Sequence, residues 1–189
     1  MKDRVRERLE PFGFGWPNVV SVGRIVLVPV VCWLIARASD QRSWAALVVF
    51  AVAAVSDGLD GYLARRHRMT TTTGAWLDPL SDKLLVSAPA VVLSALGLFP
   101  WWATAVIIGR ELLVTVLRWR LDRRGVTMPA SPTAKLKTIS QLLALAMAMA
   151  PLPDSWDPAT LAMTVAAVVL TVYSGAEYLF TTRHRVASG

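Results

Sequence analysis

Six apolar stretches, each close to the length of a membrane-spanning helix, constrain the fold of this chain most strongly. They lie at about 19–36, 44–64, 76–99, 101–120, 136–152 and 159–181. A helix needs about 20 mostly apolar residues to cross the hydrocarbon core of a bilayer. Short segments that carry charges, threonines or prolines separate the stretches. The pattern predicts an all-α, polytopic membrane protein with six transmembrane helices.

The composition agrees with a location in lipid. Of the 189 residues, 54% are hydrophobic and 17% are charged, whereas soluble domains are about 45–50% apolar and about 25% charged. The formal charge of +7 favours an anionic membrane surface over nucleic acid as the partner, because the apolar runs themselves carry carboxylates. No segment resembles a linker, so residues 1–189 are expected to form a single domain. Cys32 is the only cysteine, which excludes an internal disulfide.

The first 15 residues form a basic segment before the first apolar stretch. Val5 and Leu9 are four residues apart among lysine and arginine, which favours a short amphipathic helix lying on the membrane surface. A solvated basic tail is the alternative. No small-residue cleavage site follows, so we expect no cleavable signal peptide.

Positive charges predict the orientation of the six helices. Fifteen of the 20 Lys and Arg residues lie at the two termini or in the segments after the second and fourth predicted helices. The segments on the other side hold only Arg37 and Arg42. By the positive-inside rule, both termini are expected in the cytoplasm. Usage rich in Ala, Arg and Val without a targeting segment is compatible with a bacterial plasma membrane. Most tryptophans fall near predicted helix ends, as interfacial anchors do: Trp44, Trp76, Trp101, Trp102, Trp119 and Trp156.

Four aspartates interrupt the second and third predicted helices: Asp57, Asp60, Asp78 and Asp82. Ionisable groups at membrane depth mark functional sites. Spacings of three and four residues place each pair on one helix face, and the turn at 66–75 brings the two faces together. Four converging carboxylates need cations, and a site with only oxygen ligands favours Mg²⁺ or Mn²⁺. Two such ions commonly promote the displacement of a leaving group at phosphorus. The predicted orientation places this site at the cytoplasmic end of the two helices.

Small residues between the aspartates suit a phosphate ligand. Gly58, Gly61, Ala64 and Gly74 leave the helix surfaces open to close approach by a nucleotide. Arg65 lies one turn after Gly61, where it can donate charge-assisted hydrogen bonds to a phosphate. The structural alternative pairs the aspartates in salt bridges with neighbouring basic residues: Arg65, Arg66, Lys83 or Arg110. Four acids at these spacings fit that alternative poorly.

At this point the chain resembles the CDP-alcohol phosphatidyltransferase family. It matches the family pattern at every fixed position, Asp57-x-x-Asp60-Gly61-x-x-Ala64-Arg65, eight residues, Gly74-x-x-x-Asp78-x-x-x-Asp82. The resemblance implies a site for two Mg²⁺ or Mn²⁺ ions with the four aspartates as ligands. It also implies that Asp82 acts as general base on the acceptor hydroxyl, and that the enzyme is a homodimer.

The resemblance further implies a pocket for the CDP part of CDP-diacylglycerol. The stretch Asn18-x-x-Ser21-x-x-Arg24 resembles the start of the family's first helix, where polar groups contact the nucleotide. The residues expected in this pocket are Asn18, Ser21, Gly61, Ala64, Arg65, Thr71 and Gly74. Two alternatives stay open, a helix N-cap for Asn18 and a plain polar turn for the threonines at 70–73.

Two further stretches bear on the acceptor alcohol, GRELLVTVLRW at 109–119 and PTAKLKT at 132–138. Both resemble those of phosphatidylglycerophosphate synthases, which implies sn-glycerol 3-phosphate as the acceptor, although Ala134 stands where glycine is common. The expected phosphate-binding residues are Arg110, Arg118, Lys135 and Lys137. The structural alternatives are topology signals for the two lysines and an intramembrane ion pair between Arg110 and Glu111.

Other functions remain open at the level of sequence. The same donor could serve another acceptor, either inositol phosphate or phosphatidylglycerol on the way to cardiolipin. A membrane prenyltransferase is less consistent, because its aspartate motifs occupy two separated loops and it has more helices. A cation transporter would place its acids near the midplane, whereas here they cluster toward one face. Metal-dependent release of CMP separates the enzyme from the transporter.

Overall fold

The computed structural model describes residues 16–38, 42–67, 74–123 and 132–187. Within these ranges, the side chains at 16–21, 57–67, 74–79, 122 and 183–187 lie outside the described part. The described chain is all-α, as the sequence predicts. Its elements are α1 (Trp16–Arg37), α2 (Trp44–His67), α3 (Gly74–Ala95), α4 (Trp101–Asp122), α5 (Pro132–Met149), the 3-10 turn η1 (Asp154–Trp156) and α6 (Asp157–Ala187). The predicted surface helix at 1–15 lies outside the described residues.

Each of the six predicted helices is present, but several boundaries are wrong by about one turn or more. The first helix begins at 16 rather than at 19, the second ends at 67 rather than at 64, the fifth ends at 149 rather than at 152, and the sixth ends at 187 rather than at 181. The third helix ends at Ala95 rather than at 99, because Gly97 adopts a φ of 77°. Its amide donates to the Ser94 carbonyl at 3.1 Å and that of Leu98 donates to the Leu93 carbonyl at 2.9 Å, which is a Schellman motif. The fifth helix begins at Pro132 rather than at 136, because proline is well suited to the first helical position.

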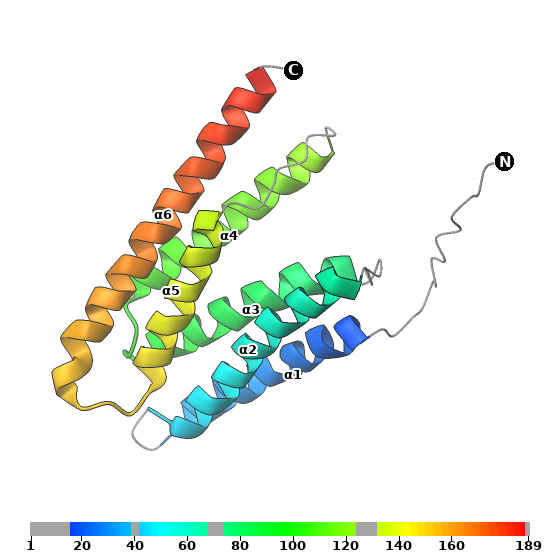
Figure 1. The fold of residues 1–189 in the computed structure, drawn as a ribbon. Coiled ribbons are helices and arrows are strands. Elements are labelled where there is room, and N and C mark those ends of the chain that lie inside the picture. The colour runs from blue at the N-terminus through cyan, green and yellow to red at the C-terminus, as the bar shows by residue number, and fades with distance from the viewer. Residues whose placement is uncertain (1–15, 39–41, 68–73, 124–131, 188–189) are drawn as a thin grey trace.

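The helices form two groups of three along the chain. The N-terminal half comprises α1, α2 and α3, in which α1 packs extensively against both partners. The C-terminal half comprises α4, α5 and α6, in which α6 packs against both α5 and α4. In Figure 1 the ribbons of the two halves lie close together at the end where α5 leads into α6. They diverge toward the opposite end, where α2 leads into α3 and α4 into α5.

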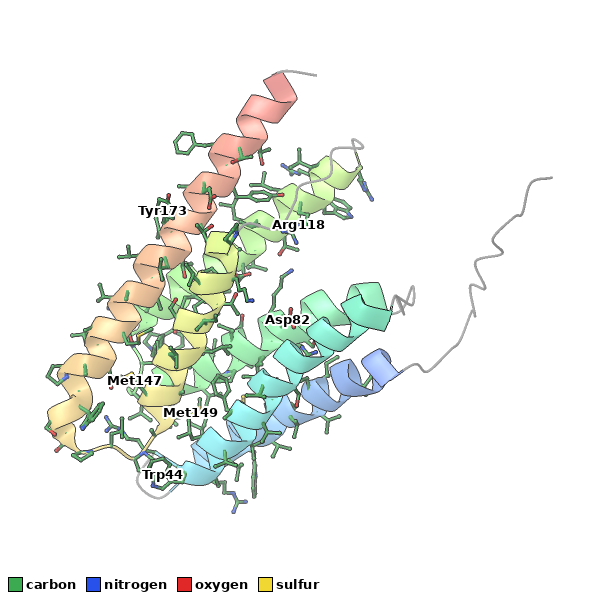
Figure 2. All side chains as sticks on the ribbon, in the orientation of Figure 1. Trp44, Asp82, Arg118, Met147, Met149 and Tyr173 are labelled. Carbon is green, nitrogen blue, oxygen red and sulfur yellow. The ribbon has the colours of Figure 1, made fainter. Side chains whose placement is uncertain are left out.

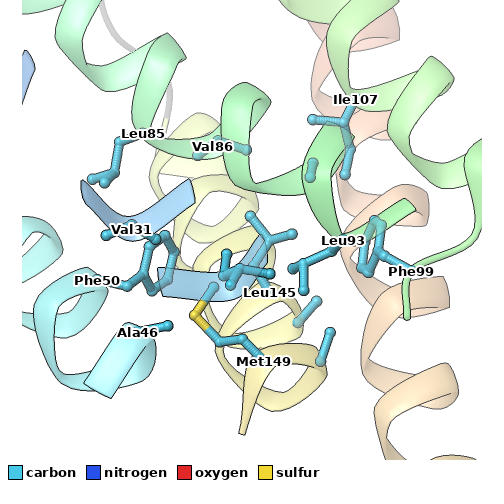
Figure 3. Packing of buried hydrophobic residues seen from close by; sticks show 14 of the residues in the cluster. Val31, Ala46, Phe50, Leu85, Val86, Leu93, Phe99, Ile107, Leu145 and Met149 are labelled. Carbon is cyan, nitrogen blue, oxygen red and sulfur yellow. The ribbon is translucent and has the colours of Figure 1, made fainter. Parts of the chain in front are cut away.

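A shared apolar core joins the two halves (Figure 3). Val31 of α1, Phe50 of α2 and Leu145 of α5 are at most 2% exposed within it. Alanines occupy many of the tightest helix contacts and are at most 1% exposed: Ala46, Ala53, Ala90, Ala103, Ala144, Ala148 and Ala167. Small residues let helices approach closely, which matters in lipid because packing rather than water exclusion drives their association.

Polar contacts join the two halves at the end of the bundle where α5 leads into α6. The Ser43 amide, just before α2, donates to the Met149 carbonyl at the end of α5 at 2.9 Å. Arg42 donates to the Leu152 carbonyl at 3.1 Å and pairs with Asp157 at 2.8 Å. These contacts join the N-terminal half to the loop between α5 and α6. The segment that carries the four aspartates, residues 57–82, is called the aspartate segment below. The two halves are therefore held together at the end of the bundle remote from this segment.

The outer surface of the bundle is strongly apolar. Large hydrophobic residues are exposed on all six helices, including Val26, Val52, Leu112 and Phe180, which is 64% exposed. Polar side chains instead lie between helices, where the hydroxyls of Ser94 and Thr104 are 2.7 Å apart and Gln141 donates to Thr171 at 2.8 Å. An apolar outer surface, with polar side chains paired between helices, is consistent with a helical membrane protein.

Helix length and apolar composition support a membrane span for fewer helices than the exposed apolar surface does. Within the described residues, one helical segment, Asp154–Thr182, is long and apolar enough to cross a membrane by these criteria. The other helices are shorter or carry more charge, as in α4 with Arg110, Glu111 and Arg118. The six helices are thus confirmed, whereas their number as membrane spans stays a prediction. Five of the six predicted tryptophan anchors are exposed: Trp44, Trp101, Trp102, Trp119 and Trp156.

Candidate functional site

The aspartate segment lies at the diverging end of the N-terminal half. Asp57 and Asp60 fall in the last three turns of α2, and Asp78 and Asp82 in the first three turns of α3. Helical periodicity therefore applies to both pairs, as the sequence predicts. The side chains of Asp57, Asp60 and Asp78 lie outside the described part, so their convergence stays a prediction. No group of three potential metal-ligating side chains occurs among those that the structure describes.

Asp82 forms an ion pair with Arg24 of α1. The Arg24 Nη1 lies 2.7 Å from the Asp82 Oδ1 and 3.3 Å from the Ser81 Oγ. The Arg24 side chain is 4% exposed, whereas that of Asp82 is 50% exposed. A cation so buried is stabilised by its carboxylate partner. Arg24 consequently fixes one oxygen of Asp82 on the surface of α3.

None of the residues predicted to bind the nucleotide has a side chain in the described part of the structure. Thr71 lies outside the described residues altogether. The remaining six lie on described helix backbone, but their side chains do not belong to the described part: Asn18, Ser21, Gly61, Ala64, Arg65 and Gly74. Asn18 and Ser21 are in the first turns of α1, the same helix that presents Arg24 to Asp82. Their role in binding stays a prediction.

A second polar cluster, the Glu111 cluster, joins the helices of the C-terminal half. It comprises Arg110, Glu111, Lys137 and Ser174. The Glu111 Oε1 accepts from the Lys137 Nζ and, at 3.2 Å, from the Arg110 Nη1. The side chains of Arg110, Glu111 and Lys137 are only 12%, 15% and 6% exposed. One buried carboxylate therefore balances part of the charge of two buried cations.

The fit of Arg110 against α6 limits its freedom. Its Nη2 donates to the Ser174 Oγ at 3.0 Å. A Cβ added at Gly175 would lie 3.3 Å from the Arg110 Cγ and 3.7 Å from its Nε, so a glycine there leaves room for the guanidinium stem. Nearby, the Thr133 hydroxyl of α5 donates to Glu177 of α6. These contacts hold α4, α5 and α6 in one arrangement at the diverging end.

The structure divides the four residues predicted to bind the acceptor phosphate. Arg110 and Lys137 are brought together through Glu111 and are nearly buried. Arg118 and Lys135 are exposed. Figure 2 labels Arg118 on α4 and Asp82 on α3, which belong to opposite halves at the diverging end. The predicted ion pair between Arg110 and Glu111 is present. Neither this ion pair nor the burial of Lys137 tests whether these residues bind a phosphate.

Arg24, Lys83 and Glu111 are polar residues near the site to which the sequence assigns no binding role of their own. Arg24 stands in the stretch expected to contact the nucleotide, and Lys83 and Glu111 are named only as partners in possible ion pairs. The sequence does indicate that Arg24 is unusual, because it is the only basic residue within the first apolar stretch. A single charge within such a stretch needs a partner of opposite charge. Its partner, Asp82, could not be read from the sequence, because the two are 58 residues apart. The same holds for Glu111 and Lys137, which are 26 residues apart.

Comparison with known proteins gives one matching family model. Residues 14–173 match the model described as CDP-alcohol phosphatidyltransferase. The matched region includes the four aspartates, the three charged residues of the Glu111 cluster, all of the first five helices and the first part of α6. It therefore covers both halves of the bundle rather than a single motif.

Curated relatives align over most of their own length. A probable phosphatidylglycerophosphate synthase of Mycobacterium tuberculosis is 41% identical over 165 residues, which cover 86% of this chain and 78% of the relative. A CDP-diacylglycerol–glycerol-3-phosphate 3-phosphatidyltransferase of Bacillus subtilis is 38% identical over 181 residues, covering 87% and 93%. Its counterpart in Escherichia coli K12 is 37% identical over 177 residues, covering 90% and 96%.

Proposed function

Because the chain belongs to the CDP-alcohol phosphatidyltransferase family, we propose that it transfers the phosphatidyl group of CDP-diacylglycerol to sn-glycerol 3-phosphate. The products are phosphatidylglycerophosphate and CMP, and the enzyme acts in phospholipid biosynthesis. The names of the relatives support this reaction. The observation that carries it is the arrangement of charge: the aspartate pattern lies in one half, and basic residues outnumber acids in the facing part of the other. Such a surface suits an acceptor that carries a phosphate.

The donor site is proposed in the N-terminal half. Asp57, Asp60, Asp78 and Asp82 would hold two Mg²⁺ or Mn²⁺ ions, since carboxylate oxygens are the ligands such ions prefer. The one described member fits, because the Asp82 side chain is 50% exposed and so accessible to an ion. When bound, the ions would supply charge neutralisation at the pyrophosphate and at the departing CMP.

The remaining donor residues would bind and orient the nucleotide. The proposed set is Asn18, Ser21, Gly61, Ala64, Arg65, Thr71 and Gly74. Arg65 would pair with a phosphate, while the small residues would let the nucleotide approach the helix backbone. Asp82 would also receive the proton of the acceptor hydroxyl. A carboxylate that held metal ions would be a weak base, so the ligand role of Asp82 is better supported than its role as a base.

The acceptor site is proposed at the diverging end of the C-terminal half. Arg118 and Lys135 are exposed and would bind the phosphate directly. Arg110 and Lys137 belong to the same proposed site, where their shared partner Glu111 keeps their cationic groups in place. The hydroxyl to be phosphatidylated would then face Asp82 across the two halves.

The proposed setting is a plasma membrane crossed by all six helices of one domain, residues 1–189. Both termini and the site would face the cytoplasm, as the distribution of Lys and Arg indicates. Exposed apolar residues on every helix support contact with lipid. A homodimer is expected from the family resemblance. An anionic bilayer is the expected partner and nucleic acid is not.

The function is tested by release of CMP from CDP-diacylglycerol with a panel of acceptors. The expected result is release that requires Mg²⁺ or Mn²⁺ and is supported by sn-glycerol 3-phosphate. Release with inositol phosphate or phosphatidylglycerol, but not with glycerol 3-phosphate, would reassign the acceptor. Metal transport without dependence on nucleotide would instead indicate a transporter.

Two variants in the same assay locate the acceptor site. Arg110→Ala and Lys135→Ala should each raise the KM for glycerol 3-phosphate more than the KM for CDP-diacylglycerol. Arg110→Ala should also lower stability, because it removes contacts to Glu111 and Ser174. Lys135 is exposed, so its loss should leave stability unchanged. Equal effects on both KM values would remove these residues from the acceptor site.

A further inference from the structure

Lys83 is a basic residue of the site region that the proposed function does not use. It follows Asp82 on α3, one helical step around the axis, and is partly buried. Its ammonium has no ion pair with any residue that the structure describes. A partly buried cation without a counter-ion is unfavourable, which makes such a group a candidate for binding an anion.

Charges from three helices surround Lys83. The Lys83 ammonium interacts electrostatically with Asp82 on its own helix and with Glu111 and Arg118 of α4. Lys137 of α5 also lies within electrostatic range of Lys83. Lys83 of the N-terminal half therefore lies within electrostatic range of basic residues of the C-terminal half. This location is at the diverging end of the bundle, beside the aspartate segment.

Neither nearby carboxylate neutralises Lys83. Asp82 is engaged by Arg24 at 2.7 Å. The Glu111 Oε1 is engaged by Arg110 at 3.2 Å and by Lys137. Among the described side chains, positive charge thus exceeds negative charge where α3 faces α4. A dianionic group placed there would gain charge-assisted hydrogen bonds from amino and guanidinium donors on both halves.

We propose that Lys83, acting with Arg118 from the opposite half, binds the phosphate group of the acceptor alcohol. This inference rests on the proposed function and deepens it, because it adds to the acceptor site a residue from the half that holds the donor. Lys83 is adjacent to Asp82, so a phosphate bound by Lys83 holds the acceptor beside that carboxylate. Lys83 selects acceptors that carry a phosphate over plain alcohols.

The experiment compares Lys83→Met and Lys83→Arg in the full chain, purified in mixed micelles with CDP-diacylglycerol. CMP release is measured against the concentration of each substrate. Lys83→Met is expected to raise the KM for glycerol 3-phosphate by about tenfold or more, the usual effect of losing a hydrogen bond to a charged group. The KM for CDP-diacylglycerol should stay within about twofold, and Lys83→Arg should restore most of the affinity because it keeps the charge.

Arg120→Gln is the matched control for loss of a positive charge at this end of the bundle. Arg120 is exposed on α4, four residues along the helix from the exposed Val116 and so on the same helix face. Its loss should leave both KM values within about twofold, since it does not face the site. If Arg120→Gln raises the KM for glycerol 3-phosphate as much as Lys83→Met does, the effect is one of general surface potential and the proposal is overturned.

Inhibition by inorganic phosphate gives a readout that does not depend on the acceptor. The inhibition constant should rise in Lys83→Met by about the same factor as the KM for glycerol 3-phosphate. A fall in kcat with both constants unchanged would indicate a structural role and overturn the proposal. A thermal unfolding midpoint close to that of wild type in Lys83→Arg shows that the recovered affinity reflects binding by a folded protein.

The inference and the proposed function can fail separately. If wild type releases CMP only with another phosphorylated alcohol, glycerol 3-phosphate is the wrong acceptor. A higher KM for that alcohol and weaker inhibition by phosphate in Lys83→Met would still support phosphate binding by Lys83. If wild type uses glycerol 3-phosphate and Lys83→Met leaves its KM and phosphate inhibition unchanged, the proposed function stands and Lys83 is excluded from the site.

Discussion

The two halves of the bundle pair their charged side chains in different ways. In the N-terminal half, a buried cation meets an exposed carboxylate: the side chain of Arg24 is 4% exposed and that of its partner Asp82 is 50% exposed. In the C-terminal half, one carboxylate is buried together with two cations: the side chain of Glu111 is 15% exposed, and those of Arg110 and Lys137 are 12% and 6% exposed.

The comparison shows that the ion pair of the N-terminal half leaves its carboxylate exposed, whereas the Glu111 cluster keeps all three of its charged side chains buried. In the C-terminal half, exposed basic residues lie outside that cluster, namely Arg118 and Lys135. An exposed carboxylate suits a metal ion, and exposed basic residues suit a phosphate. One bundle can thereby bind two anionic substrates in different ways.

The largest expected effect tests the acidic side of the comparison. Asp82→Asn should lower kcat by about 10³-fold, because it removes a charged oxygen ligand where transition-state charge is stabilised. CMP release under saturating substrates measures the loss. Asp157→Asn is the matched control, because Asp157 also pairs with an arginine, Arg42, at the opposite end of the bundle. Its activity should stay within about twofold; a comparable loss there would show that Asp82 acts through stability.

The second effect tests the basic side. Glu111→Gln should lower the free energy of unfolding by about 3 kcal/mol, because Arg110 and Lys137 would stay buried without their counter-charge. Denaturation with SDS in mixed micelles measures this change. The double variant Glu111→Gln with Lys137→Met removes one of the unpaired cations and should recover part of the stability. If the double variant is less stable than the sum of the single effects, the proposed charge balance is wrong.

The third prediction tests whether Arg24 positions Asp82 through its guanidinium group or only supplies a positive charge. Arg24→Met should lower activity by between about 10- and 100-fold, as expected for a residue that orients a metal ligand. The Mg²⁺ concentration for half-maximal activity should rise, and Arg24→Lys should recover part of both. Arg42→Met, which breaks the ion pair with Asp157, serves as reference. An unchanged Mg²⁺ dependence in Arg24→Met would show that Arg24 does not position Asp82.

The smallest effect concerns the room left for Arg110. Gly175→Ala would place a Cβ 3.3 Å from the Arg110 Cγ, so the arginine stem must shift by a few tenths of an ångström. Unfolding free energy should change by less than about 1 kcal/mol, because the gain in helix propensity offsets the tight contact. The KM for glycerol 3-phosphate should rise about twofold through the displaced guanidinium. Gly109→Ala, whose Cβ would meet nothing within 4 Å, should not raise the KM.

The outline of the fold was predictable because it depends on local information. Apolar runs between polar breaks located all six helices, and spacings of three and four residues placed the aspartates on helix faces. Boundaries were less predictable. The end of α3 depends on a Schellman motif at Gly97, and the run of apolar residues continues through it to Phe99.

The candidate site was predictable in its residue types and only partly in its contacts. The four-aspartate pattern and the basic stretches could be read because their spacing is fixed within one or two helices. The sequence treated Arg110, Arg118, Lys135 and Lys137 as equivalent. The structure separates a buried pair from an exposed pair, since burial depends on how α4, α5 and α6 pack.

By itself, the sequence determined the helices, the family pattern and the kinds of charge available, because these follow from periodicity and order along one chain. Only the tertiary structure decided which charges meet. Arg24 pairs with Asp82, Glu111 joins Arg110 to Lys137, and Lys83 is left without a counter-ion among the described residues. The physical reason is that a buried charge takes its partner from whichever helix lies against it, and that neighbour is set by packing rather than by sequence separation.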